Sequence, residues 1–130
     1  MRRAASRLLF LLATVAPSAG CVAAAAAGAG SAIYLTSRGA EGVVQGSTND
    51  VAARSRAVMA KEGITEDAQS TEKGGDEQEI KGKKGDLDVT FHIKRETPTT
   101  SKVEVTAREN LAEWDKKYAE QLLNQVVAKK

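Results

Sequence analysis

The stretch DLDVTFHIK, residues 86–94, decides the fold because its apolar and polar side chains alternate without a break. The apolar positions are Leu87, Val89, Phe91 and Ile93, and the polar positions between them are Asp88, Thr90, His92 and Lys94. Successive side chains of a strand point to opposite faces of a sheet, so this pattern predicts a strand with one buried and one solvent-exposed face.

The sequence after this strand continues the sheet and then changes its period. A turn is expected at ETPTTS, residues 96–101, and the alternation returns in KVEVTA, residues 102–107, which predicts an antiparallel hairpin. From residue 111 to residue 127, apolar residues recur at helical spacings, which predicts an amphipathic helix packed on the sheet. Its apolar stripe is Leu111, Trp114, Tyr118, Leu122, Leu123, Val126 and Val127.

The sequence before the central strand predicts a second helix and further strands. Ser47 stands three residues before Asp50, which is typical of a capping box, and Gly63 marks the expected C-terminal end. Extended segments are expected near residues 41–46, 64–70 and 76–81. We therefore predict an α+β domain over residues 37–130: a small antiparallel sheet of four to five strands, with two helices on one face, in the order β-α-β-β-β-α.

The first twenty residues have the three parts of an export signal. A basic start is followed by the apolar run LLFLLATVA, residues 8–16, and by small residues before Cys21. As a helix, this run would span about 14 Å, roughly half of a bilayer core. Residues 1–20 are therefore expected to be a signal peptide, and residues 21–36 a tether rich in Ala and Gly.

The residues around the only cysteine point to a lipid anchor. SAGC, residues 18–21, resembles the lipobox of bacterial lipoproteins, although the lipobox usually has Leu where this chain has Ser18. The resemblance implies cleavage between Gly20 and Cys21 and a diacylglyceryl group on the Cys21 sulfur. With Val22 next, it also implies delivery to the outer membrane, facing the periplasm. An ordinary signal peptide cut after Gly20 and an uncleaved anchor that continues through the alanines are the open alternatives.

Taken together, these segments are similar to the small bacterial lipoproteins grouped as domain of unknown function 3568. The likeness rests on AGC followed by Ala and Gly, on STNDVAARSRAVMAKEGI, on the turn GKKGD into LDVTFHIK, and on TSKVEV with the terminal helix. It implies a secreted, lipid-anchored α+β domain. Apart from an acylated Cys21, it implies no activity, cofactor or binding residue.

The charge balance argues against nucleic acid as a partner. The chain has 19 basic and 17 acidic residues, a formal net charge of +2. Removal of the signal would take away Arg2, Arg3 and Arg7, leaving a nearly neutral chain of mixed signs. Proteins that bind nucleic acid usually present a basic stripe or a strongly basic domain.

The sequence offers few residues for catalysis or metal binding. His92 is the only histidine, and its place in the alternation predicts a residue on the wet face of the sheet. The acidic residues between 66 and 79 lack the ligand spacing of a calcium loop and predict a solvated hairpin. We therefore expect no catalytic residue, no metal site and no cofactor.

These observations predict a non-enzymatic envelope lipoprotein, held at the membrane by its lipid anchor, that contacts another envelope protein or the cell wall. The alternative is a lipoprotein that binds a small apolar molecule or a lipid, in a pocket lined by Phe91, Trp114 and Tyr118. A hydrolytic enzyme is disfavoured because one histidine cannot complete a nucleophilic triad. The sequence makes no prediction of the oligomeric state.

Overall fold

The computed structural model describes residues 32–129. The predictions for the signal peptide, its cleavage after Gly20 and lipid attachment at Cys21 lie outside these residues. The first described element begins at Ile33. Residues 33–36, which the sequence analysis assigns to the tether, therefore hold a short strand and the turn that follows it.

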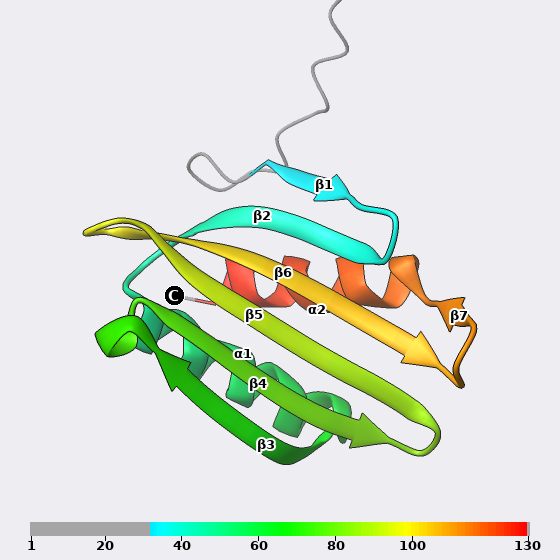
Figure 1. The fold of residues 1–130 in the computed structure, drawn as a ribbon. Helices are drawn as coiled ribbons and strands as arrows, with labels where there is room; N and C mark the ends of the chain where they lie inside the picture. Colours follow the sequence, from blue (N-terminus) through cyan, green and yellow to red (C-terminus); the bar gives the residue numbers. More distant parts are fainter. Residues whose placement is uncertain (1–31, 130) are drawn as a thin grey trace, which may run out of the picture.

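A single antiparallel sheet forms the body of the domain (Figure 1). Its seven strands are β1 (Ile33–Leu35), β2 (Gly39–Gln45), β3 (Thr65–Glu72), β4 (Glu77–Lys84), β5 (Leu87–Thr97), β6 (Thr100–Glu109) and β7 (Glu113–Trp114). The order across the sheet is β1-β2-β6-β5-β4-β3, and β7 pairs with β6 at one end. The α+β class and the antiparallel sheet are confirmed, whereas the predicted number of strands is too small.

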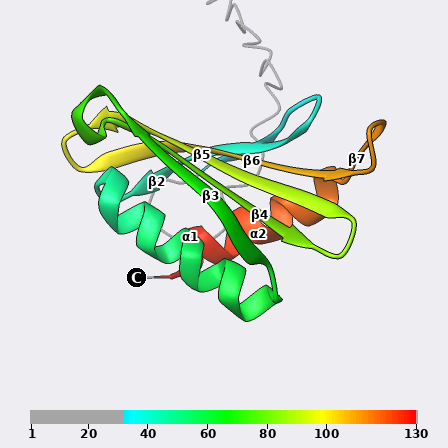
Figure 2. The same ribbon diagram turned by 60° about the horizontal axis from the view of Figure 1, so that its bottom comes forward.

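Both helices lie on the same face of this sheet (Figure 2). Helix α1 (Thr48–Glu62) packs under β3, β4 and β5, and α2 (Lys116–Ala128) packs under β2 and β6. A short 3₁₀ turn, η1 (Lys73–Gly75), joins β3 to β4. We call the face under the helices the covered face and the opposite one the open face.

The core lies between the covered face and the helices. Val89, Phe91 and Ile93 of β5 are fully buried there, as the alternation in residues 86–94 predicts. Val103 and Val105 of β6 are also fully buried. The helices add the apolar side chains Val51, Val58, Met59, Ala119, Leu122, Leu123 and Val126. The alternation therefore assigns the two faces of these strands correctly.

The predicted ends of α1 are confirmed. The Asp50 backbone N–H donates to Ser47 Oγ at 3.2 Å, and the Ser47 backbone N–H donates to Asp50 Oδ2 at 3.3 Å, which completes a capping box. The Ser47 hydroxyl also donates to Asp50 Oδ2 at 2.8 Å, and this hydrogen bond, together with the one from the Ser47 backbone N–H, holds the pKa of the Asp50 carboxyl below its ordinary value. At the other end, Gly63 adopts a left-handed conformation with φ of 71°, which a glycine tolerates without strain.

The prediction for the start of α2 is wrong. The helix begins at Lys116, not at Leu111, because Asn110 turns the chain with a left-handed φ of 56° and, after this turn, Glu113 and Trp114 pair with β6 as β7. Asp115 then caps the helix by accepting a hydrogen bond from the Tyr118 backbone N–H at 2.9 Å. Leu111 is consequently 88% exposed, and Trp114 lies outside the helix.

The predicted order β-α-β-β-β-α is therefore corrected to β-β-α-β-β-β-β-β-α. The structure has a strand at each of the five extended segments expected from the sequence, one more than the predicted order contains, and the two strands with no expected segment, β1 and β7, contain three and two residues. Strands of this length are too short to display an alternating pattern, and their neighbours β2 and β6 define them through pairing.

Candidate functional site: the open face of the sheet

A row of ionisable side chains crosses the middle of the open face. The strand register sets Glu41 opposite Glu104, Glu104 opposite His92, and His92 opposite Glu79, on β2, β6, β5 and β4 in turn. Directly opposed residues on one face of a sheet have their side chains close together. His92, half-buried on the wet side as predicted, therefore stands between two glutamates.

Basic side chains from the same face partner these glutamates. Lys102 Nζ lies 3.0 Å from Glu41 Oε1, and this contact raises the pKa of the lysine above its ordinary value. Lys81 Nζ lies 2.9 Å from Glu79 Oε1, and Arg38 Nη2 lies 3.9 Å from Glu104 Oε1. Because the charges neutralise one another locally, the open face has no strong electrostatic preference for a polyanion or a polycation.

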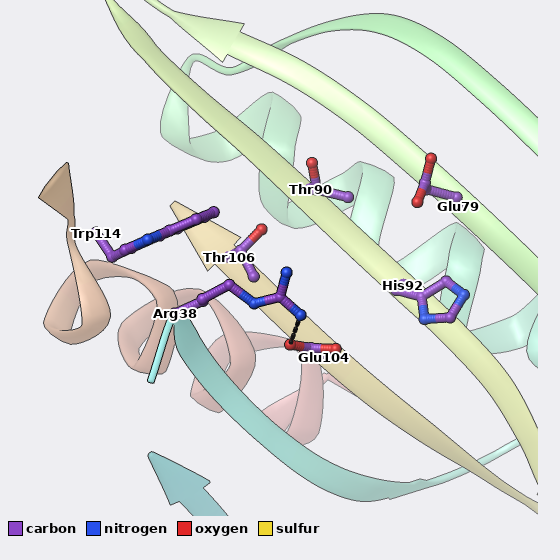
Figure 3. Close-up of a pocket in the computed structure, with 7 residues that line it drawn as sticks. All are labelled: Arg38, Glu79, Thr90, His92, Glu104, Thr106 and Trp114. Carbon is purple, nitrogen blue, oxygen red and sulfur yellow. Dashed lines mark ion pairs between the residues drawn. The ribbon is translucent and has the colours of Figure 1, made fainter. Parts of the chain in front are cut away.

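Trp114 lies over one end of this face (Figure 3). The pairing of β7 sets it opposite Arg108, whose position on β6 alternates with the buried Ala107. The guanidinium carbons of Arg108 and Arg38 lie 5.3 Å and 6.0 Å from the centre of the indole ring, within cation–π range. The indole therefore links the turn between β1 and β2 to the end of β6.

Two hollows adjoin the indole. The first, about 220 Å³, is lined by Arg38, Glu79, Thr90, His92, Glu104, Thr106 and Trp114. The second, about 360 Å³, lies toward β3 and β4 and shares Thr90, Thr106 and Trp114 with the first. Their walls combine hydroxyl, carboxylate and cationic groups with one aromatic ring, a set suited to binding a polar partner through hydrogen bonds and stacking.

The structure does not bring together the three residues of the predicted apolar pocket. Phe91 is fully buried on the covered face, whereas Trp114 lies on the open face beside Thr106. Tyr118 packs against the edge of the core, and its hydroxyl accepts a hydrogen bond from Lys84 Nζ at 3.4 Å. The interpretation of Trp114 as a core residue of a C-terminal helix is therefore wrong.

The remaining candidates from the sequence have clear positions. The acidic stretch forms the β3–β4 hairpin, and every residue of β3 is exposed, which confirms the prediction of a solvated hairpin. Within residues 32–129, no group of His, Cys, Asp or Glu side chains is arranged to hold a metal ion. The residues proposed for signal cleavage and lipid attachment, Gly20 and Cys21, lie outside the described part of the chain.

Three exposed apolar side chains were missed by the sequence analysis. In residues 32–129, the large apolar side chains that are exposed are Tyr34, Leu35 and Leu111, with exposed fractions of 59%, 58% and 88%. Tyr34 and Leu35 belong to β1, and Leu111 belongs to the loop between β6 and β7. For Leu111, the polar residues Glu109 and Asn110 directly before it were the signal of a turn.

The two helices and the comparisons with known proteins add no further functional assignment to the domain. Neither α1 nor α2 is long and apolar enough to cross a membrane. Comparison of the chain with protein-family models, with curated proteins and with solved structures finds no match. The resemblance to the small lipoproteins thus rests on the sequence motifs alone.

Proposed function

We propose that this chain is a non-enzymatic lipoprotein of the bacterial envelope, anchored through Cys21 in the outer membrane and facing the periplasm. The observation that supports the anchor is the sequence SAGC directly after an apolar run and a basic start. Two or three acyl chains hold a protein at a membrane stably, where a single chain gives only marginal binding. Acylation also removes the unpaired thiol that an exported protein would otherwise expose.

The arrangement of the chain supports a tethered domain. Residues 22–32 separate Cys21 from the start of β1, and the domain that follows has its own buried core. The covered face of the sheet is occupied by the helices, so the open face is the broad surface available for a partner. In this proposal, the open face contacts another envelope protein or the cell wall.

Palmitate labelling tests the anchor. Cells that produce the wild-type chain should incorporate label into it, and Cys21→Ser should abolish the label, whereas the control Ser31→Ala should keep it. The mass of the mature chain separates the alternatives. A lipid mass on Cys21 supports the proposal, while an unmodified chain starting at Cys21 or a chain that retains residues 1–20 overturns it.

Site-specific crosslinking tests the role of the open face. A photo-crosslinking amino acid at Thr106, on the open face, should give a defined adduct with an envelope partner in intact cells. The same amino acid at Ala53, exposed on α1, is the matched control and should give none. Equal adducts from both positions, or monomer alone from both, would remove the support for an interaction surface on the open face.

A further inference from the structure

The two hollows beside Trp114 belong to one groove that crosses the open face. The strand register aligns five residues, one from each of β2, β6, β5, β4 and β3: Gly39, Thr106, Thr90, Lys81 and Ala68. Four of them have small side chains, and the ammonium of Lys81 is paired with Glu79. This row therefore forms the floor of the groove, which is about 19 Å long at about 4.8 Å between strands.

Larger side chains form two walls along this floor. One wall is Glu104, His92 and Glu79, and the other is Arg108, Asp88 and Lys83. Each wall residue lies two positions from a floor residue of its own strand, so it points to the same face, and the two walls are about 13 Å apart. Trp114 pairs with Arg108 and extends the second wall (Figure 3). Because both hollows include Thr90, Thr106 and Trp114, the groove is continuous.

A partner in this groove can be recognised only by side chains. Strands β6, β5 and β4 each pair with a neighbour on both edges, so their backbone N–H and C=O groups are engaged in the sheet. An extended peptide cannot add there as another strand, which is how peptides bind a sheet edge. The groove is lined by the hydroxyls of Thr90 and Thr106, by carboxylates, by the His92 imidazole and by cationic groups. This set both donates and accepts hydrogen bonds, as the hydroxyls of a sugar do.

The charges of the groove favour an uncharged partner. Of the described residues, four acidic and four basic ones line the two hollows. Three of the basic residues pair with acidic residues of the walls: Lys81 with Glu79, Arg38 with Glu104, and Lys83 Nζ with Asp88 Oδ1 at 3.8 Å. A polyanion or a polycation would be attracted by one set of charges and repelled by the other.

The indole supplies the apolar contact that suits a sugar. Trp114 is partly exposed and lines both hollows. A sugar ring has C–H groups on its faces and hydroxyls at its edge, so it can pack on an aromatic ring while its hydroxyls bind the polar groups nearby. Arg38 and Arg108 already hold the indole through cation–π contacts, so little side-chain freedom is lost on binding.

We propose that this groove binds an uncharged glycan, an extended chain of sugar units, with one unit against Trp114 and others along the threonine floor. The inference rests on the proposed function, in which the open face contacts another envelope protein or the cell wall, and it names the glycan strands of the wall as the partner. A groove about 19 Å long fits a chain of several sugar units better than a single sugar.

Titration with the tetramer of N-acetylglucosamine tests the inference. The full mature chain, solubilised in detergent, has Trp114 as its only tryptophan, so the fluorescence reports on the groove. We expect a saturable change in fluorescence, with an affinity that changes little as salt is raised, because the ligand is uncharged. Thr90→Ala/Thr106→Ala removes two hydroxyls from the floor and should weaken binding about tenfold. Trp114→Ala, measured by calorimetry, should weaken it at least as much.

A matched control separates lost contacts from lost structure. Thr71→Ala/Thr99→Ala changes two exposed threonines outside the groove and should keep the wild-type affinity. Equal melting temperatures of the two double variants would show that the weaker binding does not come from unfolding. The inference is wrong if the wild-type chain shows no saturable binding, if Thr90→Ala/Thr106→Ala binds as tightly as wild type, or if the affinity falls steeply with salt.

The outcomes also distinguish this inference from the proposed function. A defined protein adduct from the crosslinker at Thr106, without binding of the tetramer, would overturn the glycan and leave the open face as a surface for an envelope protein. Binding of the tetramer by a chain that carries no lipid on Cys21 would overturn the anchor and leave the groove as a glycan site.

Discussion

The same strands make both faces of the sheet, but the covered face is apolar and buried whereas the open face is polar and partly exposed. On β5, Phe91 is fully buried under the helices, whereas its neighbours Thr90 and His92 stand half-buried on the open face. The covered face gains its free energy from apolar burial, while the open face carries charges that neutralise one another pairwise. Stability should therefore depend on the covered face, while in the proposed function the open face contacts the partner.

Phe91→Ala is the most severe test of this division. Removing a fully buried phenylalanine costs about 3–5 kcal/mol, through lost burial and the cavity left behind, and a small domain has only about 5–15 kcal/mol to lose. We expect a large fall in the denaturant midpoint. His92→Ala, one residue away on the open face, is the control and should change the midpoint little. Equal effects at the two positions would contradict the division.

Gly82→Ala tests how closely α1 and the residues that follow it pack against β4. Gly82 lies on the covered face of β4, where an added Cβ would meet the methyl of Met59, Thr65 O at 2.7 Å and Ile64 Cγ2 at 2.8 Å. Overpacking of this kind costs about 1–3 kcal/mol, and the backbone carbonyl cannot move aside cheaply. Chemical denaturation should show the loss, whereas Lys81→Ala on the open face should be nearly neutral. If Gly82→Ala has no effect on stability, α1 packs more loosely against β4 than these distances indicate.

The elements predicted correctly are those whose signals are local. The alternation of residues 86–94 and 102–107 and the capping box at Ser47 each lie within one segment of sequence, and each has the expected structure. The open-face row of Glu41, Glu104, His92 and Glu79 depends on the register of four strands, of which β4, β5 and β6 follow one another but β2 lies before α1. No single segment carries that information, so sequence reasoning placed His92 on the wet face but not among its partners.

Trp114 shows that apolar residues at helical spacing do not always belong to a helix. Its spacing from Leu111 and Tyr118 fits a helix, but the left-handed Asn110 and pairing with β6 place it on a strand instead. Asp115, which caps α2, was a usable signal, because a residue of this type before an apolar stripe commonly marks a helix start. The tertiary pairing therefore overrode a local pattern that was compatible with both outcomes.

Ser47→Ala should destabilise helix α1, on the covered face, more than the sheet itself. The substitution removes the oxygen that accepts from the Asp50 N–H, and loss of such a cap costs about 1 kcal/mol. We expect a modest fall in the melting temperature and faster hydrogen exchange in the first turn of α1. Ser70→Ala, exposed on β3, is the control. If exchange rises equally throughout the sheet, the cap is not acting locally on the helix.

Glu77→Gln should have the smallest effect and should depend on pH. Lys73 Nζ lies 2.6 Å from Glu77 Oε1, and Lys94 Nζ lies 3.6 Å from the same oxygen. The hydrogen bond from Lys73 is the main cause that lowers the pKa of Glu77 from its usual value of 4.5. A lowered pKa means that the folded state favours the carboxylate, so its stabilisation is complete above pH 4.5 and is lost as the pH falls below it.

Denaturation curves between neutral and acid pH should show a small wild-type advantage over Glu77→Gln that disappears on acidification. Ser70→Ala, which leaves this carboxyl intact, should keep the wild-type pH dependence. An advantage that persists in acid would assign the effect of Glu77 to packing, and the open face would then contribute to stability through more than its charges.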